Sequence, residues 1–468
     1  MLPGRSMLGR AAIYVWGIVV FAASEILASA LGVRFADETL GRLYQYLDPV
    51  ILRDDLLSGL YYLHSQPPLF NLGLGVVLKL FPGSHAAAFS LAFGVLALGL
   101  LLGMAWLLRS LGVSDGVNGL VCLLFALHPN FLVYRHWLFY TLPVAFLLAA
   151  GAIALKRSAV TAFCVLAGVL MLTRSVFHPL WFVLAVAVLA FIGEPGARRR
   201  LIAGGVVTLF VVNLWFLKNE RLVGSFTAST WLGLSLSKRW PLSQSETVEL
   251  KRRGALPPFW HRRPFREPRE LEGYGFFRPV EGLHPALGAP YKSNGEPNFN
   301  HQDYVDISTA LLDGNLYLMR NYPARYARRV ATSLLLFLQP GPNSVDFLVD
   351  YDFERVGRYR DAITRFVFFG GGFERPIRML TPRPNLLLVL FPLLLAVGVL
   401  ELRGSRGREV YAFLLVTVMW VTLVANLVEI GENDRMRWEV EPFLAIWLAV
   451  LLEKLRGKLR SSAAAERV

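Results

Sequence analysis

The stretch Ala11–Val33 reads AAIYVWGIVVFAASEILASALGV, and it decides the fold class of this chain. A run of about 20 predominantly apolar residues is long enough to cross a lipid bilayer as a helix. Arg5 and Arg10 precede the run, and no small-residue cleavage site follows a short apolar core. The pattern therefore predicts a retained membrane span and not a signal peptide.

The composition agrees with a membrane protein. Of the 468 residues, 54% are hydrophobic and 18% are charged, whereas a soluble chain carries about 25% charged residues. Only two cysteines are present, Cys122 and Cys164, and both lie in apolar runs where burial is expected. These features exclude a disordered chain, a secreted disulfide scaffold and an ordinary cytosolic enzyme.

Nine further apolar segments fit membrane spans, so the sequence predicts an all-α polytopic fold with about ten transmembrane helices. These segments are Ala86–Leu108, Val117–Val133, Leu142–Leu155, Ala159–Leu172, Leu180–Ile192, Leu201–Leu217, Asn385–Leu402, Tyr411–Val428 and Phe443–Leu455.

Short basic loops set the orientation of these spans. With ten spans, the cations of these short basic loops all fall on one side. The positive-inside rule assigns that side to the cytoplasm, together with both termini. These cations are Arg5, Arg10, Arg109, Lys156, Arg157, Arg198 to Arg200, Arg403, Arg406, Arg408 and Lys454 to Arg460.

The opposite side receives three segments, residues 34–85, 130–141 and 218–384. We therefore expect an N-terminal transmembrane module over residues 1–217, a non-cytoplasmic loop region over 218–384, and C-terminal transmembrane helices over 385–468. Within the loop region, Val330–Leu338 is too short to span and is predicted to lie in the membrane interface.

The net charge of +14, from 48 basic and 34 acidic residues, does not indicate nucleic-acid binding. The arginine-rich stretch Lys251–Arg269 lies on the non-cytoplasmic side, where it suits a solvated face beside anionic lipid headgroups. The sequence has no P-loop and no dinucleotide glycine pattern, which argues against an ATP-driven transporter.

The first outer loop, residues 34–85, carries the acids of most interest. Asp37 and Glu38 follow the first span directly, and the motif HSQPPL occupies His64–Leu69. The apolar stretch Leu69–Phe81 is predicted to form a helix against the outer face. A carboxylate at a membrane boundary is costly unless it is paired, hydrated or used, and desolvation tunes it toward a general base. The structural alternative for Asp37 is a turn or helix-cap acid.

An acid just after the first span, followed by a His-x-x-Pro-Pro-Leu type of motif, resembles the GT-C glycosyltransferases. That group includes protein O-mannosyltransferases and lipid A aminoarabinose transferases. The resemblance implies a GT-C-like fold and an enzyme that uses lipid-phosphate-linked sugars on the non-cytoplasmic side. It implies that Asp37 deprotonates the acceptor hydroxyl, that Glu38 supports or replaces it, and that His64 orients the site or contacts the donor phosphate. The alternative for His64 is a cap on an interfacial helix.

Cations suited to a phosphate gather in the last outer loop, GENDRMRWEVEP, at Gly431–Pro442. The resemblance extends to this loop, and Arg435 and Arg437 suit a phosphate better than lysines do. Their alternative is a structural network with neighbouring glutamates. Arg174 lies at the outer end of the fifth span. A charged side chain costs free energy there unless it faces a cavity or an anion, or reaches the interface.

The second outer loop contributes Arg135 and His136 but no carboxylate. Hard divalent cations prefer oxygen ligands, so we expect no cofactor, with a divalent metal as the alternative. Arg135 is a further candidate for the phosphate or an interfacial anchor. The resemblance and the suitability of amide, imidazole and indole groups for sugars give five candidates for substrate binding, which are open to the alternative of turn and cap chemistry. They are Gln66, Trp231, Asn298, Asn300 and His301.

The resemblance thus implies a membrane glycosyltransferase of the cell envelope. The partners that it implies are a polyprenyl-phosphate-linked hexose or pentose as donor, a glycan, lipid or protein hydroxyl as acceptor, and membrane lipids, with inversion at the anomeric carbon. The alternatives are a secondary transporter or flippase of lipid-linked glycans, which is expected to show paired repeats and broken helices near the midplane, and a non-catalytic scaffold.

Overall fold

The computed structural model describes residues 7–261, 263–278, 281–341, 353–369, 384–404 and 407–465, and within these ranges it is helical with no β-strand. Two isolated bridges, Ala36 with Trp137 and Tyr291 with Pro297, are the extended pairings found there. Parts of the predicted 218–384 loop region, at 342–352 and 370–383, lie outside the described residues.

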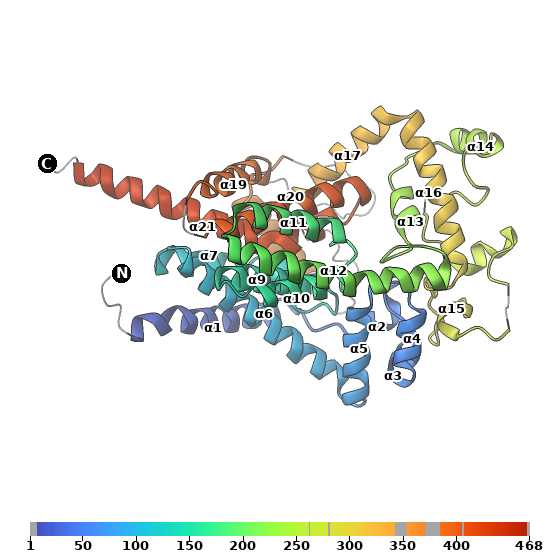
Figure 1. The fold of residues 1–468 in the computed structure, drawn as a ribbon, viewed down its shortest axis with the longest axis horizontal. Helices are drawn as coiled ribbons and strands as arrows, with labels where there is room; N and C mark the ends of the chain where they lie inside the picture. The colour runs from blue at the N-terminus through green and yellow to red at the C-terminus, as the bar shows by residue number, and fades with distance from the viewer. Residues whose placement is uncertain are drawn as a thin grey trace.

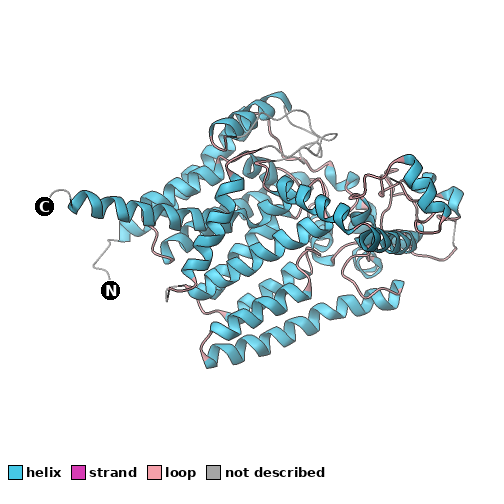
Figure 2. Cartoon of the chain, turned by 90° about the horizontal axis from the view of Figure 1, so that it is seen from above, coloured by secondary structure: helices cyan, strands magenta, loops and turns pink. Residues whose placement is uncertain are grey.

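A bundle of helices forms the larger part of the molecule (Figures 1 and 2). Its members pack mainly through pairs of neighbouring helices such as α6 with α9 and α10 with α12. The bundle comprises α1 (Met7–Ala30), α6 (His85–Ser110), α7 (Asp115–Ala126), α8 (Pro129–Arg135), α9 (Thr141–Lys156), α10 (Val160–Met171), α11 (Pro179–Ile192), α12 (Pro195–Val223), α19 (Leu387–Glu401), α20 (Arg408–Val428) and α21 (Asn433–Ala465).

Each of the ten predicted spans falls on a helix of the bundle, but few of these helices qualify as spans by themselves. Four of the described helices are long and apolar enough to cross a membrane: α1 from Ala11, α6, α12 and α20. The pair α7 and α8 adds a fifth if it is counted as one bent span. The total of ten spans stays a prediction.

The segment Val117–Val133 differs from the straight span that the sequence predicted. The chain bends by 62° between α7 and α8. Pro129 supplies no backbone N–H, so it cannot continue α7, and it begins α8 instead. The His128 side chain accepts a hydrogen bond from the backbone N–H of Asn130 and caps the new helix.

Basic loops of the bundle meet at one end. The Glu453 carboxylate accepts a hydrogen bond from the backbone of Ser114 at 3.0 Å and lies 3.8 Å from Arg456. Lys454 pairs with Glu401 close by. Helix α1 begins and α21 ends toward this same end of the molecule (Figures 1 and 2).

Short helices cover the opposite end. Helices α2 to α5 lie across the bundle axis, and α13 to α16 extend beyond it (Figure 1). The helices concerned are α2 (Thr39–Arg42), α3 (Pro49–Asp54), α4 (Leu56–Tyr62), α5 (Pro68–Leu80), α13 (Leu232–Ser237), α14 (Gln244–Arg252), α15 (Pro285–Gly288), α16 (Asp303–Asn321), α17 (Pro323–Phe337) and α18 (Phe353–Phe366), with 3₁₀ turns at Pro268–Glu270 and Glu272–Tyr274.

The segment that carries α13 to α16, which we call the outer unit, has a hydrophobic core of its own, distinct from that of the bundle. Trp231, Trp240, Trp260 and Tyr304 are among its buried residues. Helices α13 and α16 approach closely at Gly233, where a Cβ atom would lie 1.8 Å from the carbonyl oxygen of Ser308. The outer helices are therefore a packed structure and not a set of loops.

The apolar piece at Val330–Leu338 belongs to helix α17 for most of its length. Helix α17 packs against α16, α20 and α21 and is not among the described helices that qualify as spans. Its position in the membrane interface stays a prediction.

Candidate active site

A cavity of about 700 Å³ lies where the bundle meets the outer helices. Its wall comes from segments far apart in the sequence, including the first, second and last outer loops. The lining residues that carry polar groups or aromatic rings are Thr39, Arg42, Tyr44, Gln45, Gln66, Trp137, Phe139, Tyr140, Arg174, Ser175, His178, Thr227, Ser229, Trp231, Ser235, Lys238, Phe265, Glu296, Glu429, Glu432 and Arg435.

Arg435 is held in this wall by a carboxylate and an aromatic ring. Its Nε donates a 3.1 Å hydrogen bond to Oε2 of Glu432, and its Nη2 donates to the same oxygen. The guanidinium lies 4.8 Å from the centre of the Phe139 ring. Arg435 is almost fully buried, with 3% of its surface exposed. Glu432 directly precedes α21 and Arg435 lies in its first turn, so the cation is held on a rigid helix.

Arg174 lies in the same wall and has a different carboxylate. Its Nε is 3.1 Å from Oε1 of Glu439, whose side chain is fully buried behind the wall. Its Nη1 donates to the hydroxyl of Tyr140, and its guanidinium lies 4.3 Å from the centre of that ring. Arg435 is 5.8 Å from the centre of the Tyr140 ring. Tyr140 therefore lies beside both arginines.

Each of these arginines retains an unused donor. Within the described residues, Nη2 of Arg174 and Nη1 of Arg435 have no hydrogen-bond partner although both side chains are buried. Buried polar groups are nearly always paired, and guanidinium groups bind phosphate oxygens in bidentate geometry. Arg174 and Arg435, which we call the arginine pair, both lie beside Tyr140 and are therefore suited to bind an anion.

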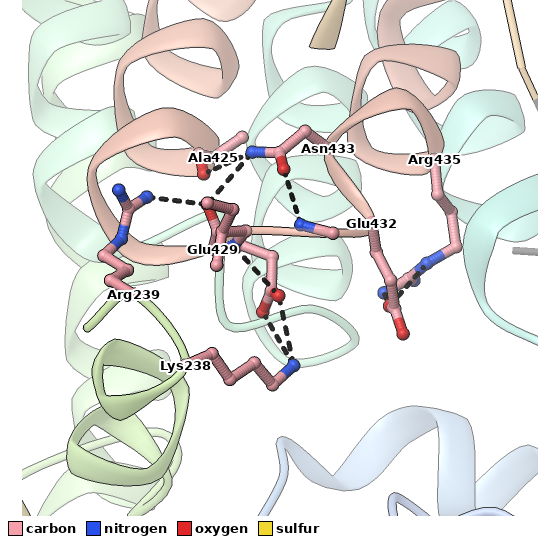
Figure 3. Close-up of polar contacts among 9 residues, drawn as sticks. Lys238, Arg239, Ala425, Glu429, Glu432, Asn433 and Arg435 are labelled. Atoms are coloured by element: carbon pink, nitrogen blue, oxygen red, sulfur yellow. Dashed lines mark hydrogen bonds and ion pairs between the residues drawn. The ribbon is translucent and has the colours of Figure 1, made fainter. Parts of the chain in front are cut away.

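A third cation reaches the cavity from the outer unit. Nζ of Lys238, from the end of α13, lies 3.1 and 3.3 Å from the two carboxylate oxygens of Glu429 (Figure 3). Burial lowers the pKa of Lys238, but the charges of Glu429 and Glu432 more than offset this, so its pKa stands above the ordinary value. Lys238 is therefore an ammonium that ties the outer unit to the last outer loop.

The last outer loop is pinned around this ion pair. Arg239 donates to the backbone carbonyls of Asn426 and Glu429, and the Asn433 amide donates to the carbonyls of Ala425 and Glu429 (Figure 3). These bonds occupy backbone carbonyl groups at the C-terminal end of helix α20, where intrahelical partners become few. Glu429 and Glu432 are thereby held on one turn, one directed at Lys238 and the other at Arg435 (Figure 3).

Aromatic side chains form another part of the cavity wall, which also includes the charged side chains of Arg42 and Glu296. Tyr44 is 40% exposed, and its ring stacks on Phe265 at 6.1 Å. Trp231, a predicted sugar-binding residue, lines the cavity but is mostly buried and donates its Nε1 proton to the carbonyl of Phe299. Gln66 also lines this part. The aromatic rings of this surface suit the faces of sugar rings.

His64 and Asn300 do not line the cavity, and the structure joins them to each other. Asn300 Oδ1 accepts hydrogen bonds from the backbone N–H groups of His64 and Ser65. Nε2 of His64 lies 2.8 Å from the carbonyl oxygen of Asn300, and Nδ1 lies 3.0 Å from the Thr230 hydroxyl. We call this contact the His64–Asn300 clasp.

The clasp fixes the protonation of His64. A carbonyl accepts but never donates, so Nε2 carries the proton, and Nδ1 accepts from Thr230. The imidazole is fully buried, and burial lowers its pKa to about 3. His64 is therefore neutral and joins the first outer loop to the outer unit.

Asn298 and His301 also have local partners. The Asn298 amide donates to the carbonyls of Ala286 and Ala289, and its Oδ1 accepts from the backbone of Asn300. Nδ1 of His301 accepts from the backbone of Asp303 at the start of α16, and the ring packs 4.8 Å from that of Phe277. Both residues shape the turn that carries Asn300.

Asp37 and Glu38 do not line the cavity, although they directly precede Thr39, which does. Asp37 Oδ2 is 3.5 Å from Nε2 of His85, and Glu38 occupies the cap position of α2 without a side-chain cap bond. The backbone of Ala36 pairs with the second outer loop through the carbonyl of His136.

Arg135 and Arg437 are directed elsewhere. Arg135 lies 3.1 Å from Glu25 of α1. Arg437 pairs with Glu441 at 2.9 Å and donates to the backbone carbonyls of Phe337 and Gln339, which ties α21 to the end of α17. The structure thus brings Arg174, Arg435, Gln66 and Trp231 together in one cavity, and leaves Arg135 and Arg437 outside it.

Tyr140, Lys238 and Glu429 are among the cavity residues that were missed at the level of sequence. Tyr140 had a usable signal, since it closes the second outer loop that already held Arg135. Lys238 and Glu429 are 191 residues apart, and no local pattern connects them. Among the described residues, no group of three or more His, Cys, Asp or Glu side chains is arranged to hold a metal ion.

The apolar helices and the polar cavity at one end of the bundle define the class, an all-helical membrane protein. No family profile and no characterised protein matches the chain by sequence. Among solved structures it is similar to ArnT from Cupriavidus metallidurans bound to undecaprenyl phosphate, at 17% identity over 92% of this chain and 78% of that chain, with a TM-score of 0.34. A likeness at that TM-score does not define the site, which has to be understood from the chain's own residues.

Proposed function

We propose that this protein is a GT-C-like membrane glycosyltransferase that moves a sugar from a polyprenyl-phosphate donor to an acceptor hydroxyl on the non-cytoplasmic face. The observation that carries the proposal is the arginine pair, two buried guanidinium groups in one cavity wall, each with an Nη donor that has no partner among the described residues. Arginine is the residue best suited to bidentate phosphate contacts. The cavity lies at the end of the bundle away from the basic loops, in keeping with a site on the non-cytoplasmic side.

The reaction that fits this wall is a single displacement with inversion. A carboxylate takes the proton of the acceptor hydroxyl, the acceptor oxygen bonds to the anomeric carbon, and the bond from that carbon to the phosphate oxygen breaks. The electron pair of that bond stays on the phosphate. Arg174 and Arg435 stabilise the charge that develops there, which is commonly the largest single contribution to such a reaction. The aromatic part of the wall, at Tyr44 and Trp231, suits the sugar rings.

The proposal is tested by ligand selectivity. The purified protein in nanodiscs is expected to bind undecaprenyl phosphate at least about tenfold more tightly than undecaprenol, because the two ligands differ only in the group that the arginine pair recognises. Quenching of tryptophan fluorescence measures both affinities, since Trp137 and Trp231 line the cavity. Equal affinities would reject the proposed donor class. Mass spectrometry of envelope glycans with and without the gene then identifies the transferred sugar.

The base is proposed to be Asp37, with Glu38 in support, on the strength of the resemblance of the first outer loop. Asp37→Asn is expected to lower transfer by about 10²–10⁴-fold, the usual contribution of a general base, while undecaprenyl phosphate binding is kept. Glu296 is the matched comparison, because its side chain lines the cavity wall and Asp37 does not. If Glu296→Gln abolishes transfer and Asp37→Asn does not, the base belongs to Glu296.

Metal dependence has its own test. Since arginines are proposed to neutralise the leaving phosphate, transfer is expected to change by less than about twofold in excess EDTA. Loss of transfer in EDTA and its return with Mn²⁺ would show that a cation shares the role given to Arg174 and Arg435.

A further inference from the structure

The two arginines that line the cavity carry different kinds of carboxylate partner. Glu439, which faces Arg174, is fully buried behind the wall. Glu432, which faces Arg435, lies in the wall itself with 27% of its side chain exposed. A ligand that enters the cavity can therefore compete with Glu432 for its arginine, whereas Glu439 is out of reach.

Glu432 occupies the donors that a phosphate needs. Both Nε and Nη2 of Arg435 bond to Oε2 of Glu432, which is the edge of the guanidinium used in a bidentate contact. Nη1 of Arg435 remains unused among the described residues. A phosphate that bonds to Nη1 alone gains one contact, and one that displaces Glu432 gains the bidentate edge as well.

Other cations also lie near Glu432. Lys238 and Arg174 each exert an attractive charge on the Glu432 carboxylate, in addition to Arg435. Lys238 extends from the neighbouring α13 toward the same turn (Figure 3). A carboxylate that leaves Arg435 therefore does not become an isolated charge, which would be costly in a buried site.

We propose that Glu432 is a displaceable counter-ion of the donor site: it neutralises Arg435 in the empty cavity, yields the guanidinium to the phosphate monoester of the lipid, and moves toward Lys238. The inference rests on the proposed function, since it assigns a ligand to the same cavity. It adds a residue that limits the affinity for the phosphate and keeps the lipid phosphate product from being held too tightly. No bond other than hydrogen bonds and ion pairs changes in this exchange.

The test compares Glu432→Gln with the wild type in undecaprenyl phosphate binding, measured in nanodiscs by tryptophan fluorescence. The amide keeps the size of the side chain and removes its charge, so the phosphate no longer competes with an anion for Arg435. The affinity is expected to rise by about tenfold or more. Equal or weaker binding by Glu432→Gln, at an unchanged melting temperature, overturns the counter-ion role. If Glu432→Gln does not fold, Glu432→Ala takes its place with the same expected direction.

Glu441→Gln is the matched control, because it also removes a carboxylate from an arginine on α21. Glu441 pairs with Arg437, and neither residue lines the cavity. Its affinity for undecaprenyl phosphate is expected to stay within about twofold of the wild type. Glu432→Asp, which keeps the charge, is likewise expected not to tighten binding. A tightening by Glu441→Gln or Glu432→Asp equal to that of Glu432→Gln contradicts the proposal.

Inorganic phosphate separates the headgroup from the lipid. As a competitor of undecaprenyl phosphate it is expected to gain affinity in Glu432→Gln by a similar factor, because the exchange occurs at the phosphate; a gain confined to the lipid overturns the proposal. The two proposals fail differently. Wild-type protein that does not prefer undecaprenyl phosphate to undecaprenol rejects the proposed function, whereas a selective wild type with an unaltered Glu432→Gln rejects the counter-ion alone.

Discussion

The first and the last outer loops look alike in sequence and differ in the structure. Both place charged residues just outside a span, and both carry a motif that resembles the same family of enzymes. The last loop places Arg435 and Glu432 in the cavity wall, at the start of α21. In the first loop, His64 is buried in a clasp with Asn300, and the residues that reach the cavity from this loop include Thr39, Tyr44 and Gln66. The last loop supplies a buried ion pair to the cavity wall, and the first loop supplies polar and aromatic side chains together with Arg42.

The difference has a physical cause. Arg239 and Asn433 donate to backbone carbonyls at the end of α20, so much of the support of the last loop comes from side chains other than its cavity-lining charges. Glu429 and Glu432 line the cavity, where they pair with Lys238 and Arg435.

The first loop is also held by residues of the outer unit, since Asn300 bonds to the backbone of His64 and Tyr62, and Lys292 donates to the carbonyl of Leu43. There, however, the His64 side chain itself takes part in the contact and does not line the cavity.

The largest effect is expected from a substitution in the last outer loop. Arg435→Ala removes one guanidinium of the arginine pair, and transfer with undecaprenyl-phosphate-linked donor is expected to fall by about 10²–10³-fold, the cost of losing one charge-stabilising donor. Steady-state kinetics in nanodiscs measures the loss. The control is Arg53→Ala, because Arg53 is an exposed arginine paired with Asp54 and does not line the cavity. A similar loss in both variants would remove the contrast between the loops.

The second effect concerns the first outer loop. His64→Ala removes a buried ring and two hydrogen bonds and leaves the Asn300 carbonyl and the Thr230 hydroxyl without that partner. The expected cost is about 2–4 kcal/mol of unfolding free energy, seen as a lower melting temperature in detergent. His261→Ala, at an exposed histidine, is expected to leave the melting temperature within about 1 °C. A stable His64→Ala variant that had lost all transfer would give His64 a role in chemistry instead.

These outcomes bear on what the sequence can predict. Apolar runs locate every helix of the bundle, because a span is a local property of about 20 residues. Arg174 and Arg435 are identifiable for a related reason, since a cation at a membrane boundary requires a partner or an anion. The 62° bend at Pro129 and the separate outer core are harder to foresee, because both depend on tertiary packing.

The role of His64 shows more clearly which contacts cannot be predicted from the sequence. Its motif identifies the loop, but its partners Thr230 and Asn300 are 166 and 236 residues away in the chain. Whether such a histidine contacts a ligand or a backbone carbonyl depends on which distant turn packs over it. The same holds for Lys238, whose partner Glu429 belongs to a helix end in the other half of the molecule.

The smallest effect is a slope in the pH dependence of stability. Burial lowers the pKa of His64 to about 3 in the folded protein, whereas an unfolded histidine has a pKa of about 6.5. The unfolded chain therefore binds a proton below about pH 6.5 that the folded chain does not bind until about pH 3. The stability contributed by neutral His64 is complete above pH 6.5 and falls by at most about 1.4 kcal/mol per pH unit below it.

Substitution isolates this slope from those of other groups. His64→Gln cannot titrate, so the difference in melting temperature between the wild type and His64→Gln is expected to shrink as the pH falls from 6.5 to 4.5. The clasp explains the direction: a protonated imidazole would turn Nδ1 into a donor and force the Thr230 hydroxyl to reorient, in a site where the charge is desolvated. A difference that stays constant over this range would mean that His64 is protonated or solvated in the folded protein. His64 would then carry a charge in the first outer loop, as Arg435 does in the last one.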